Sequence, residues 1–287
     1  MPSLAERLRF LVSPRFRAEH PLVPVVRLSG AIGVSTGLRQ GLSFQGVASA
    51  LEKAFTAPGA RAVALLINSP GGSPTQSHLI FRRIRLLAEE KKLPVYAFCE
   101  DAAASGGYMI ACAADEIFAD DNSIVGSIGV VSGGFGFHEL INRYGVERRL
   151  YTTGENKAIL DPFRPEREED IVHLKALQQE VHESFIALVR RRRGDVLADA
   201  PDLFTGLFWT GATSRDLGLI DRIGDIRSTL RERFGDKVRM RLVGGPRSLF
   251  SRRQGVGVEI GAGLTQGWAD EAIGALEQRA LWARYGL

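Results

Sequence analysis

Residues 61–74 read RAVALLINSPGGSP, and this stretch decides the fold. Its first eight residues form a short, almost continuous apolar run, which is typical of a strand buried on both faces of a parallel sheet. The turn SPGGSP follows at once, and two adjacent glycines let backbone amides approach another group with no Cβ in the way. The stretch therefore predicts a buried parallel strand that ends in a sharp turn with accessible N–H groups.

Strands and helices alternate on both sides of this stretch. The pattern predicts an α/β fold with mostly parallel pairing and one closing helix–turn–helix–strand unit at 209–242. Runs rich in apolar residues predict strands at 22–28, 61–68, 93–99, 116–119 and 123–131, and a further strand is expected at 147–152. Helical spacing predicts helices at 44–56, 75–91, from near Ser105 to 114, and at 166–193.

Composition places the chain among globular proteins, since 45% of its 287 residues are hydrophobic and 24% are charged. The net charge of +4 is compatible with an anionic partner but does not require one. No aromatic-rich basic strand or zinc-finger spacing occurs, so we exclude nucleic acid as a partner. Cys99 and Cys112 match no zinc or redox spacing, and we expect no metal or cofactor.

The ends of the chain differ from its middle. No apolar stretch approaches the ~18 residues of a transmembrane helix, and the FLV run near the start is too short for a signal peptide. We therefore expect a cytoplasmic protein. A basic N-terminal segment, 1–21, leaves a peripheral contact with the inner face of the membrane open; a short docking helix is the alternative. The main domain is expected at 22–242, followed by a linker and a C-terminal amphipathic helix at 243–287.

Ser105 and Lys157 are the residues best placed for nucleophilic chemistry. Ser105 lies in ASGGY, between a predicted strand and a predicted helix whose N-terminus favours an anion. The alternative role of Ser105 is a helix N-cap. A serine nucleophile needs a base, and a lysine serves only when neutral. Lowering a lysine pKa from ~10.4 to near 7 costs roughly 4–5 kcal/mol and requires burial. Lys157, in TGENKAIL, is otherwise a surface lysine.

The two glycines after strand 61–68 could supply oxyanion-hole amides, although an ordinary strand-to-helix turn is the better explanation when this motif is taken alone. A histidine base is the other possibility. The chain has five histidines, and none has a tight, glycine-framed setting. His138 is the one candidate that the pattern places.

The joint order of five motifs is more specific than any one of them. The chain contains INSPGG (67–72), ASGGYMIACAADEIFA (104–119), VGSIGV (125–130), GENKAILDPFRPE (154–166) and WTGATSRDLGLID (209–221). This series resembles the S49 serine peptidases, the signal peptide peptidase family, over about residues 22–242. The resemblance implies a crotonase/ClpP-like α/β fold and ring-like homo-oligomers.

The resemblance also implies roles for single residues. Ser105 would be the nucleophile, Lys157 the general base, and Ser127 the residue that orients the lysine. The oxyanion-hole residues would be Gly71, Gly72 and Gly106. The implied activity is that of a serine endopeptidase with a Ser-Lys dyad, without metal or cofactor. Signal-peptide remnants or other apolar or unfolded peptides would be its substrates. Because the peptidase unit occurs once, we expect both dyad residues in the same chain.

Three other functions remain open at this point. A crotonase-type acyl-CoA hydratase or isomerase would usually need catalytic carboxylates after the glycine turns, where Ser73 and Gly106 stand. A ClpP-like Ser-His-Asp peptidase would need a histidine base, for which His138 is the candidate. A catalytically silent ring scaffold at the membrane would have no chemical reason to keep the serine–lysine set.

Overall fold

The computed structural model of the chain describes residues 20–36 and 39–244. The basic N-terminal segment predicted at 1–21 lies outside these residues except for its last two, and so do the linker and helix predicted at 243–287 except for their first two. In the part of the chain that is described, no helix is long and apolar enough to cross a membrane.

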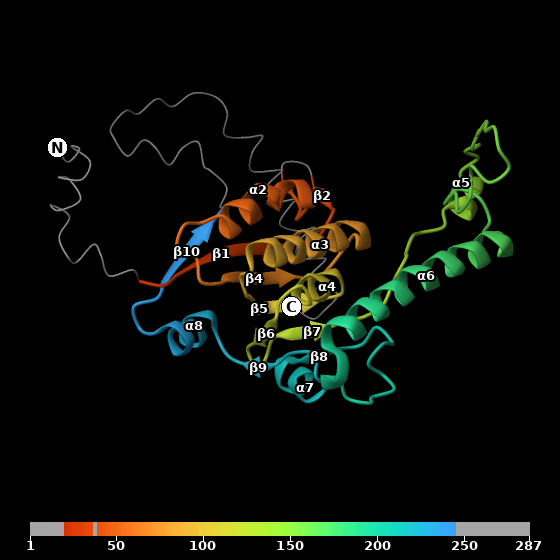
Figure 1. Cartoon of the computed structure of the whole chain (residues 1–287). Helices are drawn as coiled ribbons and strands as arrows, with labels where there is room; N and C mark the ends of the chain where they lie inside the picture. Colours follow the sequence, from red (N-terminus) through yellow and green to blue (C-terminus); the bar gives the residue numbers. More distant parts are fainter. Residues whose placement is uncertain (1–19, 37–38, 245–287) are drawn as a thin grey trace, which may run out of the picture.

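An eight-stranded sheet forms the centre of the molecule (Figure 1). Along its main path every neighbouring pair is parallel, which confirms the predicted α/β class. The path runs through β10 (Arg239–Val243), β1 (Leu22–Ser29), β4 (Val63–Ser69), β5 (Val95–Ala104), β6 (Glu116–Ala119) and β9 (Arg222–Ile223). β7 (Ile124–Gly126) pairs parallel with β5 and antiparallel with β8 (Phe208–Thr210). β2 (Ser35–Thr36) and β3 (Arg39–Gln40) form a separate antiparallel pair.

Helices cover both faces of the sheet, which explains the unbroken apolar run of β4. Leu65 and Ile67 belong to a core shared with the helices of the first face, and Ala64 and Leu66 pack with the core of the other. The first face carries α2 (Phe44–Phe55), α3 (Pro74–Lys91), α4 (Gly106–Ala111) and the C-terminal half of α6 (Glu168–Arg193). The opposite face carries α8 (Ile226–Phe234). The short α7 (Gly211–Asp216) follows β8.

One part of the chain extends away from the sheet. We call residues 131–167, with α5 (His138–Arg143), the arm; it lies at the far end of α6 (Figure 1). Rings of Phe135, Phe137 and Phe163 contact one another there, and the Phe137 amide donates to the Pro162 carbonyl over 2.6 Å.

The strand predicted at 147–152 is wrong, because this segment lies in the arm with no regular structure. Leu150, Tyr151 and Thr152 favour a strand, but no sheet edge lies beside the segment to pair its backbone. Tyr151 is 90% exposed. The strand predicted at 123–131 is shorter than expected and ends at Gly126, where the chain turns.

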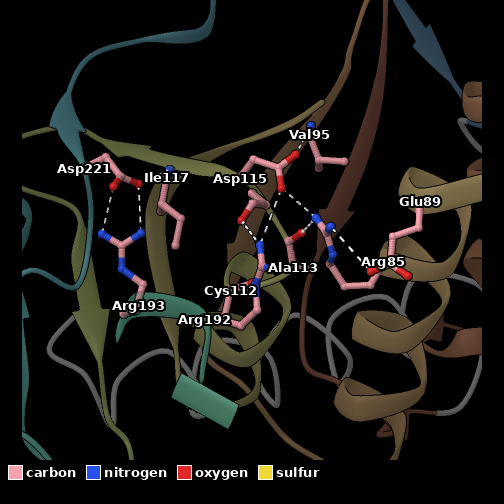
Figure 2. Close-up of polar contacts among 11 residues, drawn as sticks. Arg85, Glu89, Val95, Cys112, Ala113, Asp115, Ile117, Arg192, Arg193 and Asp221 are labelled. Carbon is pink, nitrogen blue, oxygen red and sulfur yellow. Dashed lines mark hydrogen bonds and ion pairs between the residues drawn. The ribbon is translucent and has the colours of Figure 1, made fainter. Parts of the chain in front are cut away.

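A buried ion pair joins the end of α6 to the sheet. The Arg193 guanidinium donates to both carboxylate oxygens of Asp221, over 2.9 and 3.0 Å (Figure 2). It also donates to the Gly218 carbonyl over 2.9 Å. The Asp221 carboxylate also accepts from the Ile117 amide in β6 over 2.7 Å. Only 6% of the Arg193 side chain is exposed. This clamp therefore fixes α6 against β6 and the turn before β9.

We expect Arg193→Ala to lower the free energy of unfolding by about 3 kcal/mol, because Asp221 would keep its charge in a largely buried place without a cation. Urea unfolding followed by circular dichroism measures the change. Arg215→Ala is the matched control, since its pair with Asp216 is exposed. It should stay within about 0.5 kcal/mol of the wild type. Equal losses of unfolding free energy in the two variants would show that the buried pair stabilises the fold no more than an exposed pair does.

Candidate active site

The site lies where three neighbouring parallel strands end. Ser69 of β4 is opposite Ala103 of β5, and Ala104 of β5 is opposite Gly126 of β7. The carboxyl ends of parallel strands meet at one edge of a sheet, where ligands bind in open α/β folds. The residues just after these strands are therefore brought together, although they are far apart in the sequence.

A cavity of about 740 Å³ opens at this edge. It contains four of the predicted site residues: Ser105, Ser127, Gly71 and Gly72. Backbone and small side chains form much of its wall, and four apolar residues line it as well: Ala31, Val34, Val130 and Val131. The cavity can therefore receive a chain with small or apolar side chains next to the two serine hydroxyls.

Ser105 has an unusual backbone conformation. Its φ and ψ are 51° and −119°, a sparsely populated combination for a residue with a side chain. Its amide donates to the Gly126 carbonyl over 2.8 Å, which fixes β5 to β7 at this point. Ser105 occupies the N-cap position of α4, but its hydroxyl makes no capping hydrogen bond. The strained turn therefore presents a half-buried hydroxyl that the helix does not use.

The glycine turn packs directly against Ser105. A Cβ on Gly71 would lie 2.7 Å from the Ser105 Cβ and 2.9 Å from the Gly106 nitrogen, so only glycine allows this approach. The Gly71 amide donates to the Ser69 hydroxyl over 3.2 Å and is therefore occupied. Gly71 thus serves this site by its lack of a side chain.

Two other amides, of Gly72 and Gly106, lie beside Ser105. The bridge to Ile32 uses the Gly71 carbonyl and the Ser73 amide, which leaves the Gly72 amide outside that bridge. Gly106 is the first residue of α4, and the first amides of a helix have no intrahelical acceptor. N–H groups from a glycine turn and a helix N-terminus are well suited to stabilise a negative oxygen beside Ser105.

Two arginines hold the other end of α4. Arg192, from α6, donates to the carbonyls of Cys112 and Ala114, each over 2.8 Å (Figure 2). Arg85, from α3, and Arg192 both pair with the Asp115 carboxylate, at 2.7 and 3.5 Å. Cations at the C-terminus of a helix satisfy its last carbonyls and complement its dipole. These contacts fix the position of the helix that follows Ser105.

Ser127 lies directly after β7 and also has a positive φ, 53°. Its amide donates to the Leu207 carbonyl over 2.7 Å. Gly126, before it, packs against the Trp209 ring, where a Cβ would come within 2.8 Å of a ring carbon. The two serines therefore lie on adjacent strand ends, each held by a turn that tolerates little change.

Lys157 does not line the cavity in this chain. It lies in the arm, its side chain is exposed, and its loop is tied to the start of α6. The Asp170 carboxylate accepts from the Leu160 amide over 3.4 Å and pairs with Arg167 at 2.5 Å. The hydrogen bond from Arg167 keeps the pKa of Asp170 below its usual range. The loop therefore has a defined position, apart from the cavity.

The histidines are arranged differently from the sequence-based expectation. His138 lies in the arm, near Glu139, and does not line the cavity. His182, which the sequence analysis did not select, does line it. Its helix is long and rich in charged residues, so the sequence offered no obvious sign that His182 faces the site. Its spacing from Phe185 and Val189, both buried, is the signal that could have shown that it faces inward.

Other chemistries find little support at this edge of the sheet. In residues 20–36 and 39–244, no group of three His, Cys, Asp or Glu side chains could hold a metal ion. Complete burial raises the pKa of the Cys99 and Cys112 thiols to about 12. Neither thiol is therefore a nucleophile at neutral pH.

We expect Gly71→Ala to abolish labelling of Ser105 by a fluorophosphonate, a reagent for activated serine hydroxyls, because the new Cβ would displace Ser105 and Gly106. Gly30→Ala is the control, since φ is +97° at Gly30 and +101° at Gly71, but a Cβ on Gly30 meets no atom within 4 Å. Both changes strain the backbone by about 1–2 kcal/mol. Mass spectrometry measures the fraction of each variant that carries the label on Ser105. Equal labelling of the two variants would contradict the close approach.

Known proteins resemble this chain in sequence and in fold. The sequence pattern described as "Peptidase family S49" matches residues 88–236. "Putative protease slr0021" of Synechocystis is 32% identical over 68% of this chain and 72% of its own length. A solved chain of the "1510-N membrane-bound stomatin-specific protease", a lysine-to-alanine mutant in complex with a substrate peptide, is 14% identical, with a TM-score of 0.49 over 88% of this chain and 97% of that one.

A longer relative extends the comparison to the whole chain. "Na(+)/H(+) antiporter NhaA" of Brucella abortus is 54% identical over 100% of this chain, which spans 39% of that protein. Most of the Brucella protein thus has no counterpart here. The family pattern covers more than half of the chain and includes Ser105, Ser127 and Lys157. The chain belongs to peptidase family S49.

Proposed function

We propose that the chain is a serine endopeptidase in which Ser105 attacks a peptide carbonyl and Lys157 acts as general base. One observation carries this proposal. The Ser105 hydroxyl lies without a capping bond on a strained strand-to-helix turn, beside glycine amides and inside a cavity. Strained turns at binding edges are characteristic of nucleophilic serines. Membership of a peptidase family favours this chemistry over acyl-CoA chemistry and over a silent scaffold.

The reaction would proceed in two steps. The neutral amine of Lys157 takes the Ser105 hydroxyl proton as the serine oxygen bonds to the substrate carbonyl carbon. Amides of Gly72 and Gly106 stabilise the resulting oxyanion. The lysine then gives the proton to the leaving amine as the peptide bond breaks. A water, deprotonated by the same lysine, hydrolyses the acyl-serine and regenerates Ser105.

We propose further that a neighbouring copy of the chain supplies Lys157. The lysine is exposed on the arm, whereas a lysine base requires burial. The arm itself exposes large side chains that are unusual on a free surface: Phe135 is 80% and Tyr151 90% exposed. Docking of the arm on a second copy would cover them and could bring the lysine to Ser105. This arrangement accords with the ring-like oligomers that the family resemblance implies, and it replaces the expectation of a dyad within one chain.

The cavity favours a particular class of substrate. Its apolar wall residues suit apolar or small residues at the cleavage site, and among the described residues no Asp, Glu, Lys or Arg lines it. Unfolded segments and signal-peptide remnants have this character. A location in the cytoplasm, at the inner face of the membrane, stays a prediction.

Mixing two inactive variants tests the proposal. We expect Ser105→Ala and Lys157→Ala each to lose hydrolysis of short apolar fluorogenic peptides. Subunits dissociated, mixed and reassembled in equal amounts should recover about a quarter of wild-type activity, because one site in four of a cyclic ring would combine an intact serine with an intact lysine.

The possible outcomes separate the parts of the proposal. Two inactive variants that never complement each other, despite mixed assembly, would place both residues in one chain. Full activity of Lys157→Ala would exclude it as the base, and full activity of Ser105→Ala would exclude the serine mechanism.

A further inference from the structure

We propose that His182 is a positioning residue of this site, whose ring N–H holds the turn that carries Ser127. The inference rests on the proposed function, because the position of Ser127 affects catalysis only if Ser127 orients the base of Ser105. His182 comes from α6 and lines the same cavity as the two serines.

The contact shows which ring nitrogen of His182 carries a proton. Its Nε2 lies 3.0 Å from the Ile128 carbonyl oxygen. A carbonyl oxygen can only accept a hydrogen bond, so Nε2 carries the proton and donates it. In the neutral ring the lone pair is then on Nδ1. This hydrogen bond therefore joins α6 to the residue that directly follows Ser127.

The Ser127 turn depends on a few such contacts. The Gly129 amide donates to the Ser127 carbonyl over 3.0 Å and closes a tight turn around Ile128. The Leu207 carbonyl accepts from the Ser127 amide on one side of this turn, and the His182 ring donates to the Ile128 carbonyl. No regular structure follows from 127 to 137, where the chain leaves for the arm. Without the histidine, the turn loses its hydrogen bond to α6, and the Leu207 contact and the buried Ile128 side chain are left to hold it.

α6 is a rigid support for this contact. Phe185 and Val189, which share the helix face of His182, are 3% and 0% exposed. The Arg193 clamp fixes the end of the same helix. Residues that act from well-packed helices hold their targets more closely than residues on loops. The ring therefore fixes the turn relative to the core.

A role as general base is the main alternative. Such a base would direct a lone pair at the Ser105 hydroxyl, but His182 uses Nε2 as a donor to the Ile128 carbonyl. In a neutral ring Nδ1 still has a lone pair, so a variant is needed to separate the base role from the positioning role. His182→Gln separates the two roles, because a glutamine amide can donate from about the place of Nε2 but cannot act as a base.

The experiment compares His182→Gln, His182→Phe and the control His173→Phe in the full-length protein. His173 lies on the same helix and is exposed. The measurements are kcat and KM on an apolar fluorogenic peptide, the rate of fluorophosphonate labelling of Ser105, the oligomer size and the melting temperature. Ser105→Ala and Lys157→Ala are run in parallel.

We expect His182→Phe to lower kcat and the labelling rate about 10- to 100-fold, with KM, oligomer size and melting temperature little changed. Glutamine should restore kcat to within about fivefold of the wild type, and His173→Phe should have no effect. Equal inactivity of the Gln and Phe variants, with the assembly intact, would overturn the positioning role in favour of a base. If His182→Phe changes only KM, or changes neither kcat nor KM, then His182 merely lines the cavity and the positioning role is refuted. Activity of Lys157→Ala would instead refute the proposed dyad.

Discussion

The parallel pairing of β5 with β4 on one side and with β7 on the other is the constraint on which the site depends. It places Ser69, Ala104 and Gly126 at one edge, so that the residue after each strand faces the same cavity. A register slip of one residue would turn the side chains of a strand to the opposite face. Burial of both faces of β4 prevents such a slip, because each face fits a different core. The chemistry of the site is therefore a consequence of core packing.

The strain at the two serines is stabilised from outside the cavity. Ser105 and Ser127 both have φ near +50°, a conformation that costs free energy for residues with a side chain. Such strain persists only where the surroundings determine the backbone. For Ser105, the surroundings are the short α4, capped by Arg85 and Arg192, and the Tyr108 hydroxyl, which donates to the Leu219 carbonyl over 2.8 Å. These groups act at a distance from the cavity, from the far end of α4.

Sequence reasoning found what has a local signature. The buried strand 61–68, the glycine turn and the strand-to-helix junction at Ser105 each follow from a few neighbouring residues, and the structure has all three. It failed where the partner is remote. Residues 147–152 have the composition of a strand, but whether a strand forms depends on a neighbouring sheet edge, which composition does not reveal. His182 and the Arg193–Asp221 clamp were missed for the same reason: their partners lie 54 and 28 residues away.

The exposed position of Lys157 has a physical logic if the base comes from a second copy. A lysine in water is charged and cannot accept a proton, so a single chain would hold a strained serine without a base. Burial of the arm would remove water from the lysine and cover its apolar surface in the same event. Assembly would then be the step that creates the base, since the desolvation that neutralises a lysine must be offset by the apolar area that docking buries. An isolated chain, folding in the presence of other unfolded proteins, would remain inactive until that step.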